Sequence, residues 1–159
     1  MKLILLRHAK SDWDDPLQDD RDRPLNLRGR EAAPRVGAWL RANGHQPDLI
    51  LCSTATRTRE TRARLGFDTT PTEYRDALYL APAGVILRMA RASQIAPAPP
   101  LTLMIVGHNP GIAEAAAQAC LTRPAHPDFD RYPTCACTVI DSTNGLPGKP
   151  LAFLVPRDL

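Results

Sequence analysis

The chain has 159 residues, of which 43% are hydrophobic and 23% charged, and its formal net charge is +3. This length suits one domain over residues 1–159 with a sizeable core, and the composition excludes a disordered chain. The small basic excess suits an anionic ligand but gives no electrostatic case for nucleic acid, and 5% aromatic residues are too few for base-stacking platforms.

The apolar runs are too short for a signal peptide or a membrane span. A cytoplasmic protein that does not bind membranes is therefore expected. The four cysteines lie in apolar stretches, where a free thiol behaves as a small buried hydrophobe. Cys135 and Cys137 would share one face of a strand, but no further Cys or His stands at a ligand spacing, so no metal site is expected.

Strands and helices are predicted to alternate along the chain. In order, the pattern predicts a strand at residues 2–6, a helix at 28–43, a strand at 49–52, a helix at 55–65, a strand at 72–75, a helix at 82–93, a strand at 101–106, a helix at 111–121, and strands at 134–141 and 151–155. Asn26 is a suitable N-cap for the first helix, and Pro34 should kink or restart it. The polar residues 14–22 predict a loop over the end of the first strand.

This alternation predicts an α/β fold, a three-layer α/β/α sandwich with a mostly parallel central sheet. The last strand is the one that could run antiparallel. In such a sheet the carboxyl ends of the strands line the crevice where ligands bind.

Three of the predicted strands end on polar residues that suit a site. Arg7 and His8 follow the first strand, Arg57 follows the second within a few residues, and His108 follows the strand at residues 101–106. We therefore expect two arginines and two histidines at one rim of the sheet.

These motifs resemble the histidine phosphatase superfamily, whose fold is phosphoglycerate mutase-like. The residues that carry the resemblance are Leu6-Arg7-His8-Ala9, Ser53 with Arg57 and Thr61, and Val106-Gly107-His108-Asn109-Pro110. The small SixA-type branch, which contains phosphohistidine phosphatases, is similar over Arg7-His8-Ala9-Lys10-Ser11-Asp12-Trp13, Asp22-Arg23-Pro24-Leu25-Asn26 and Gly29-Arg30. The resemblance extends from Met1 to about Thr143.

Phosphoryl transfer needs positioning and positive charge around the transferred group, which two guanidinium forks can supply. A neutral His8 can attack phosphorus and form a phosphohistidine that water hydrolyses, a route without metal or cofactor. Its tautomer should be fixed by a bond from the other ring nitrogen to a backbone carbonyl. The resemblance implies the same roles, with His8 as nucleophile and Arg7, Arg57 and His108 around the phosphate.

Further substrate contacts are expected from Lys10, Ser11, Arg23 and Asn109. For Arg23 the alternative is an ion pair that holds the loop, with Asp20 or Asp22 as its partner. The residues themselves leave both possibilities open.

One position departs from the larger members of the family. They carry a Glu general acid after a Leu-Tyr pair, whereas Leu80 follows Leu78-Tyr79 here. Without a proton donor an alcohol leaves as an alkoxide, whereas a phosphorylated imidazole can leave neutral. The chain also lacks room for a lid, which favours a shallow, open pocket.

The prediction is a metal-independent phosphatase, monomeric, that acts on phosphohistidine of a protein partner. A broad phosphomonoesterase on the same scaffold and a phosphate-binding module without turnover are the alternatives.

Overall fold

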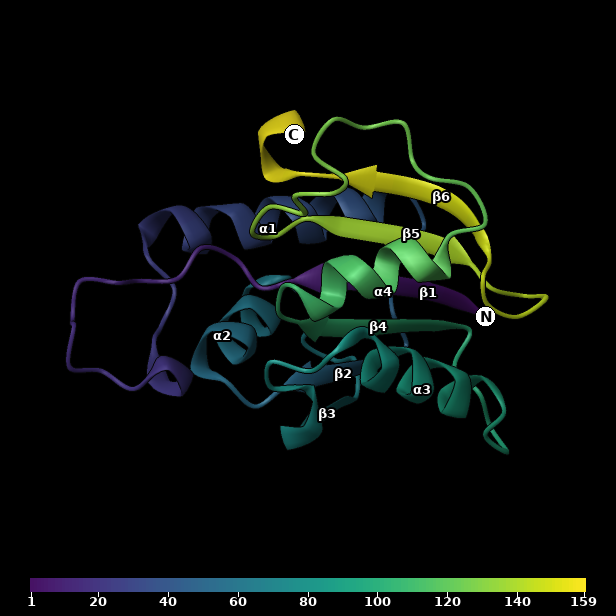
Figure 1. Ribbon diagram of the computed structural model, residues 1–159, viewed down its shortest axis with the longest axis horizontal. Helices are drawn as coiled ribbons and strands as arrows, with labels where there is room; N and C mark the ends of the chain where they lie inside the picture. Colours follow the sequence, from purple (N-terminus) through teal and green to yellow (C-terminus); the bar gives the residue numbers. More distant parts are fainter.

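The structure, a computed structural model, describes residues 1–159 as a six-stranded sheet with helices on both faces (Figure 1). The strands are β1 (Lys2–Arg7), β2 (Leu49–Ser53), β3 (Thr72–Arg75), β4 (Thr102–Gly107), β5 (Cys137–Asp141) and β6 (Lys149–Leu154). The helices are α1 (Leu27–Ala42), α2 (Thr56–Arg64), α3 (Ala83–Gln94) and α4 (Gly111–Ala119), with short 3₁₀ turns η1 (Asp20–Asp22), η2 (Asp76–Leu78) and η3 (Pro156–Asp158). The predicted α/β sandwich is confirmed.

The strand order is β3-β2-β4-β1-β5-β6. β1 pairs with β4, β4 with β2, and β2 with β3, all in parallel. β5 is antiparallel to β1, and β6 is antiparallel to β5, so β6 runs in the same direction as β1. The strand that runs against the others is therefore the fifth and not the last. The chain reverses direction between β5 and β6, so β6 runs parallel to β1 and to the other strands.

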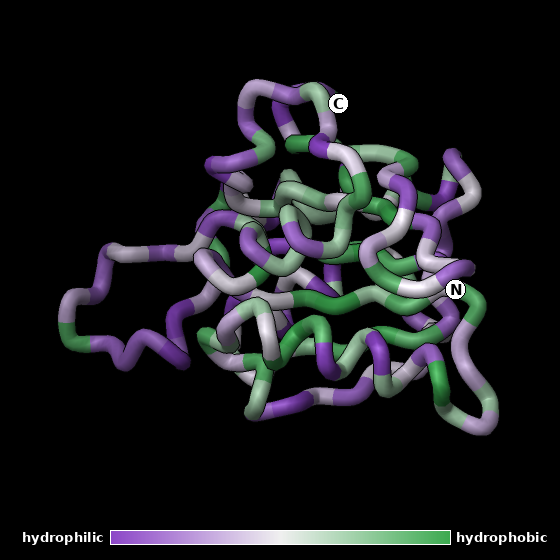
Figure 2. The backbone as a smooth tube through the Cα atoms, turned by 45° about the vertical axis from the view of Figure 1, so that its right-hand side comes forward, coloured by the Kyte–Doolittle hydropathy of each residue, from purple (hydrophilic) through white to green (hydrophobic).

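Two apolar clusters lie on opposite faces of the sheet. Leu3 and Leu5 of β1 pack with α3 and α4, whereas Ile4 and Leu6 of the same strand pack with α1. This division follows from the two-residue period of a strand, which sends successive side chains to opposite faces. Figure 2 shows the strands as the hydrophobic centre of the chain. A strand buried on both faces holds the residues at its end firmly in place.

Helix α1 begins at the predicted N-cap, where the side chain of Asn26 accepts a hydrogen bond from the backbone nitrogen of Gly29 at 2.9 Å. Gly29 also packs on the chain after β1, since a Cβ there would lie 2.2 Å from the carbonyl oxygen of Lys10. The predicted restart at Pro34 is wrong, because α1 continues through it, whereas a kink there stays a prediction. Buried Ala33 and Val36 on either side of the proline hold the helix against the sheet. None of the four helices combines the length and the apolar character that crossing a membrane requires.

Candidate active site

The carboxyl ends of β1, β2 and β4 meet at a cavity of about 270 Å³. Arg7, His8, Arg57 and His108 all line it, and we call this cavity the histidine pocket. The loop that follows β1 extends away from the sheet (Figure 1) and then returns through η1 to the same rim. The structure thus brings together the four residues predicted to share one site.

His8 is held in one tautomer. Its Nδ1 lies 2.7 Å from the carbonyl oxygen of Ala9. A carbonyl oxygen can only accept, so Nδ1 must donate and Nε2 keeps its lone pair. Burial lowers the pKa of His8 to about 3, with further lowering by His108, Arg57 and Arg7, while the bond to Ala9 acts in the other direction. A neutral imidazole with a free Nε2 is the form that a nucleophile requires.

His108 lies beside His8, with ring centroids 5.2 Å apart, but its partners differ. Its Nε2 lies 2.8 Å from the hydroxyl oxygen of Ser53, at the end of β2. Burial, followed by the charge of Arg57, lowers the pKa of His108 to about 3. The serine hydroxyl can donate to Nε2, and the hydrogen of the neutral ring then sits on Nδ1, which has no partner within the protein. The neutral ring of His108 therefore keeps one buried N–H that no protein acceptor uses.

Two arginines reach the pocket from different elements. Arg7 ends β1, and its Nη1 donates to the carbonyl oxygen of Tyr132 at 3.0 Å. Arg57 lies in the first turn of α2 and is only 2% exposed. Thr61, one turn later, accepts from the backbone nitrogen of Ala9 at 2.9 Å, which fixes α2 against the chain beside His8. Both guanidinium groups are thus oriented before any ligand binds, as phosphoryl transfer requires.

Asp20 is a pocket residue that the sequence suggested only as a partner for Arg23. Its carboxylate binds Nη2 of Arg57 at 3.0 Å, Nη2 of Arg23 at 2.7 Å and the hydroxyl of Tyr79 at 2.6 Å. Burial acts to raise the pKa of Asp20, but hydrogen bonds from Tyr79, Arg23 and Arg57 outweigh it and hold the pKa far below its usual value. The position of Asp20 three residues before Arg23 was the signal available in the sequence.

The other predicted contacts also line the pocket. Arg23 lines the pocket and pairs with Asp20, whereas no ion pair joins it to Asp22, and its contact with substrate stays a prediction. Ser11 accepts from Nη1 of Arg23 at 3.3 Å. Asn109 uses its side-chain nitrogen on the carbonyl oxygens of Arg131 and Tyr132, at 3.2 and 3.1 Å. Its amide therefore secures the neighbouring loop beside the pocket.

Comparison with known proteins points to one family. A sequence model of the histidine phosphatase superfamily (branch 1) matches residues 3–79. An uncharacterized protein of Mycobacterium tuberculosis is 45% identical over 106 residues, which cover 66% of this chain and 63% of that protein, so the match spans less than two thirds of the relative. The solved structure from Agrobacterium tumefaciens named as a phosphohistidine phosphatase SixA is 29% identical, with a TM-score of 0.81 and coverage of 98% of this chain and 97% of that one. A SixA structure from Nakamurella gives a TM-score of 0.77 at 29% identity, over 98% and 95% of the two chains.

The chain belongs to the histidine phosphatase superfamily, in its SixA-type branch. Its α/β fold is that of the phosphoglycerate mutase-like proteins.

Leu80, which follows the Leu78-Tyr79 pair and stands where the family resemblance led us to expect an acid, lines the pocket. Leu80 adopts a left-handed backbone conformation, with φ of 49°, and is 53% exposed. Trp13 forms another part of the rim and is 68% exposed. The chain therefore presents apolar side chains at a rim whose interior is polar and buried. Sequence reasoning did not assign Trp13 or Thr134 to the pocket. Thr134 was predicted to begin a strand, but it lies in the turn before β5, which begins only at Cys137.

The pocket offers no obvious site for a metal ion, since no group of three or more His, Cys, Asp or Glu side chains is arranged to hold one. Cys135 and Cys137 are buried free thiols, and Cys135 precedes β5 in a left-handed conformation. A reaction without metal, a cytoplasmic location and a monomeric state stay predictions.

Proposed function

We propose that this protein is a phosphatase that hydrolyses phosphohistidine on a protein partner through a phosphorylated His8. The observation that carries the proposal is the contact of His8 Nδ1 with the Ala9 carbonyl, which leaves Nε2 free inside a pocket lined by Arg7 and Arg57. The family and the SixA-type branch support phosphatase chemistry at this site.

In the first step Nε2 of His8 attacks phosphorus in line with the departing nitrogen. A P–N bond to His8 forms while the P–N bond of the substrate breaks, and the electron pair stays on the departing imidazole. In the protonated form of phosphohistidine the other ring nitrogen already carries a hydrogen, so from that form the imidazole leaves neutral without a proton donor from the protein. Arg7 and Arg57 neutralise the equatorial oxygens, and His108 donates a hydrogen bond to them.

In the second step water attacks the phosphorus of phosphorylated His8. The bond from phosphorus to Nε2 breaks, inorganic phosphate forms, and one proton of the water passes to solvent or to a phosphate oxygen. His8 returns to its neutral form, which its pKa of about 3 maintains at neutral pH.

The preference for a P–N bond is supported by two side chains near the rim. Leu80 has no proton to give to a departing alkoxide. Asp20 lines the pocket but its pKa is held far below the usual value, so it is ionised and a poor general acid. A positioned acid typically contributes about 10²–10⁴-fold to the rate of expelling an alcohol.

The first experiment compares kcat/KM for a phosphohistidine peptide with that for an aryl phosphate. The proposal predicts a preference of about 10²-fold or more for the P–N substrate, in line with the contribution of a missing acid. A preference for aryl or sugar phosphates would instead assign the protein to the broad phosphomonoesterases.

The second experiment traps the intermediate. Brief reaction with a ³²P-labelled phosphohistidine peptide should leave an acid-labile label on the protein. The label should vanish in His8→Ala and persist in His126→Ala, the matched control, since His126 lies outside the pocket. A protein that binds the peptide but never carries label or releases phosphate would be a phosphate-binding module.

A further inference from the structure

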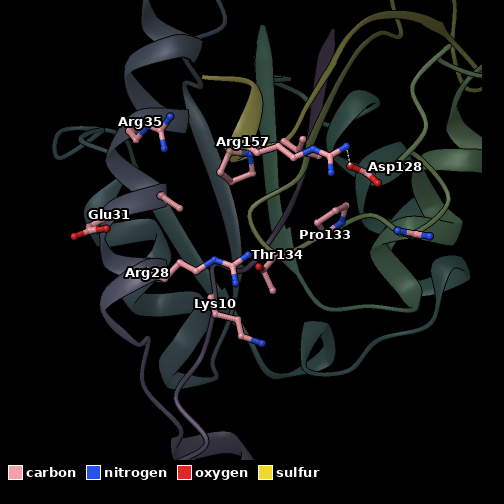
Figure 3. A pocket seen from close by; sticks show the side chains of 12 residues that line it. Lys10, Arg28, Glu31, Arg35, Asp128, Pro133, Thr134 and Arg157 are labelled. Carbon is pink, nitrogen blue, oxygen red and sulfur yellow. Dashed lines mark ion pairs between the residues drawn. The ribbon is translucent and has the colours of Figure 1, made fainter.

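A second cavity has a volume of about 400 Å³, and Figure 3 shows the side chains that line it. Lys10 and Thr134 line both cavities, so the two are immediate neighbours. The second cavity is larger than the first. We call it the basic cleft, after the five cationic side chains in its lining: Lys10, Arg28, Arg35, Arg131 and Arg157.

The charge of the basic cleft is unbalanced. Only two acidic residues, Glu31 and Asp128, stand against the five cations. Asp128 is already paired with Arg157, and no ion pair joins Glu31 to any residue. Arg157 also lies 4.0 Å from the carboxylate of Asp158, and Arg35 donates a hydrogen bond to the backbone oxygen of Leu159, so the uncompensated positive charge comes from the other three cations.

Three of these cations have no partner. The side chains of Lys10, Arg28 and Arg131 make neither an ion pair nor a hydrogen bond, although they lie around one cavity. In the histidine pocket, by contrast, Arg23 and Arg57 are both bound to Asp20. Like charges gathered without counter-charges repel one another and destabilise the fold, so an arrangement of this kind suits a surface that meets an anionic partner.

The cations come from separate parts of the chain. Figure 3 shows Arg28 extending from α1 toward Thr134, with Lys10 below it on the segment after β1. Glu31 points to the other side of α1, and Arg157 lies across the cavity beside Asp128. Cations spread around a broad cleft match several anionic groups spaced along a chain better than one compact phosphate, on which the charges would converge.

We propose that the basic cleft binds an acidic stretch of the phosphoprotein, beside the phosphohistidine that enters the histidine pocket. This inference rests on the proposed function and adds the recognition surface to it. The shared lining by Lys10 and Thr134 places the acidic residues within a few positions of the phosphorylated histidine. Carboxylates pair with Arg28 and Arg131, and recognition of the partner is electrostatic.

The test uses three substrates that share the P–N bond. One is a phosphohistidine peptide with two Glu residues on each side of the histidine, the second is the same peptide with Gln at those four positions, and the third is phosphoramidate. With the unmodified protein the Glu peptide should have a KM about tenfold lower than the Gln peptide, as expected from two or three exposed ion pairs.

The variants are Arg28→Glu and Arg131→Glu. Each should raise the KM of the Glu peptide about tenfold, because an attraction becomes a repulsion, while the kinetics with phosphoramidate stay unchanged. Arg88→Glu is the matched control, because Arg88 is an exposed arginine without a partner on α3, which contributes nothing to the cleft. A peptide with Lys at the four positions should recover affinity with Arg28→Glu, which no structural defect would produce.

The outcomes separate this inference from the proposed function. Equal KM values for the Glu and Gln peptides, with phosphoramidate hydrolysed normally, would overturn the acidic docking and leave the phosphatase standing. If Arg28→Glu raises the KM of a small bisphosphate but not that of the Glu peptide, the cleft binds a second phosphate group and not an acidic peptide. Failure to hydrolyse any of the three P–N substrates would instead overturn the proposed function.

Discussion

The histidine pocket and the basic cleft are neighbouring cationic cavities built in opposite ways. In the pocket Arg23 and Arg57 are nearly inaccessible, and both are fixed by Asp20. In the cleft Arg28 and Arg131 are exposed and have no partner. A fixed, buried guanidinium is arranged for a charge that develops at one point, whereas a free, exposed one adapts to a partner that varies in shape. Burial and pairing with a carboxylate therefore separate an arginine suited to catalysis from one suited to binding a partner.

The same substitution made in both cavities tests this contrast most directly. Arg57→Lys should lower kcat/KM for a phosphohistidine substrate about 10²-fold, because a single ammonium cannot keep both contacts with Asp20 and still offer further N–H groups to phosphate. Arg28→Lys keeps the charge that the cleft requires and should change kcat/KM less than about twofold. Steady-state kinetics measure kcat/KM for both variants. A similar decrease in kcat/KM for the two would contradict the contrast between a fixed, buried arginine and a free, exposed one.

The second prediction concerns acid stability. The pKa of both His8 and His108 is about 3 in the folded protein, against about 6.5 for a free histidine. Below pH 6.5 the two histidines bind protons in the unfolded chain but stay neutral in the folded protein. The free energy of unfolding therefore falls as the pH drops from 6.5 toward 3. At pH 5 the loss is about 2 kcal/mol for each histidine, relative to pH 8.

Urea unfolding at pH 8 and pH 5 measures this loss. His8→Asn should remove about half of the part that the two pocket histidines contribute, and His8→Asn combined with His108→Asn should remove that part, leaving the contribution of His45, whose pKa is also lowered by burial. The arginines of the basic cleft keep their charge throughout this range and contribute nothing to it. If the double variant loses as much unfolding free energy between pH 8 and pH 5 as the unmodified protein, the acid sensitivity comes from groups outside the histidine pocket.

The third prediction concerns the anion that the pocket already contains, the carboxylate of Asp20. Asp20 occupies both terminal nitrogens of Arg57, one through its backbone oxygen at 2.6 Å and the other through its side chain at 3.0 Å. Asp20→Asn removes a negative charge from the lining while keeping the shape of the side chain. Inorganic phosphate should then bind about tenfold more tightly, since a repulsion of about 1–2 kcal/mol is lost. Isothermal titration calorimetry measures the change.

A weaker affinity in Asp20→Asn would contradict this prediction. It would show that the carboxylate acts mainly by holding Arg57 and Arg23 in position. Asp19→Asn is the matched control, because Asp19 precedes η1 on the same loop but does not line the pocket.

Much of the pocket could be read from the sequence because its residues follow buried strands. A strand such as β1, apolar on both faces, must end where polar residues begin, and Arg7 and His8 mark that end. The same reasoning applies to β4 and His108. Parallel pairing then brings these ends together, with Arg7 in register with Gly107.

The parts that could not be read depend on contacts between distant loops. The pairing of Asp20 with Arg57 joins residues 37 positions apart, and nothing in the local pattern of either segment indicates it. The basic cleft joins α1 to the loop around Arg131 and to the 3₁₀ turn containing Arg157, three segments whose charges look unremarkable one at a time. Continuity of α1 through Pro34 was also unpredictable, since burial of its neighbours against the sheet outweighs the lost backbone hydrogen bond.

The smallest predicted effect is the response of the two cavities to salt. Exposed charges are screened once the Debye length falls below their separation, from about 14 Å at 50 mM to about 6 Å at 300 mM salt, whereas buried pairs are screened much less. Over that range kcat/KM for the Glu peptide should fall about fivefold, because its docking depends on exposed Arg28 and Arg131. For phosphoramidate, which contacts only the buried groups of the histidine pocket, the change should stay below about twofold. Equal losses for the two substrates would show that solvent ions reach Arg57 as readily as Arg28, and the distinction between a fixed interior and an adaptable surface would then be wrong.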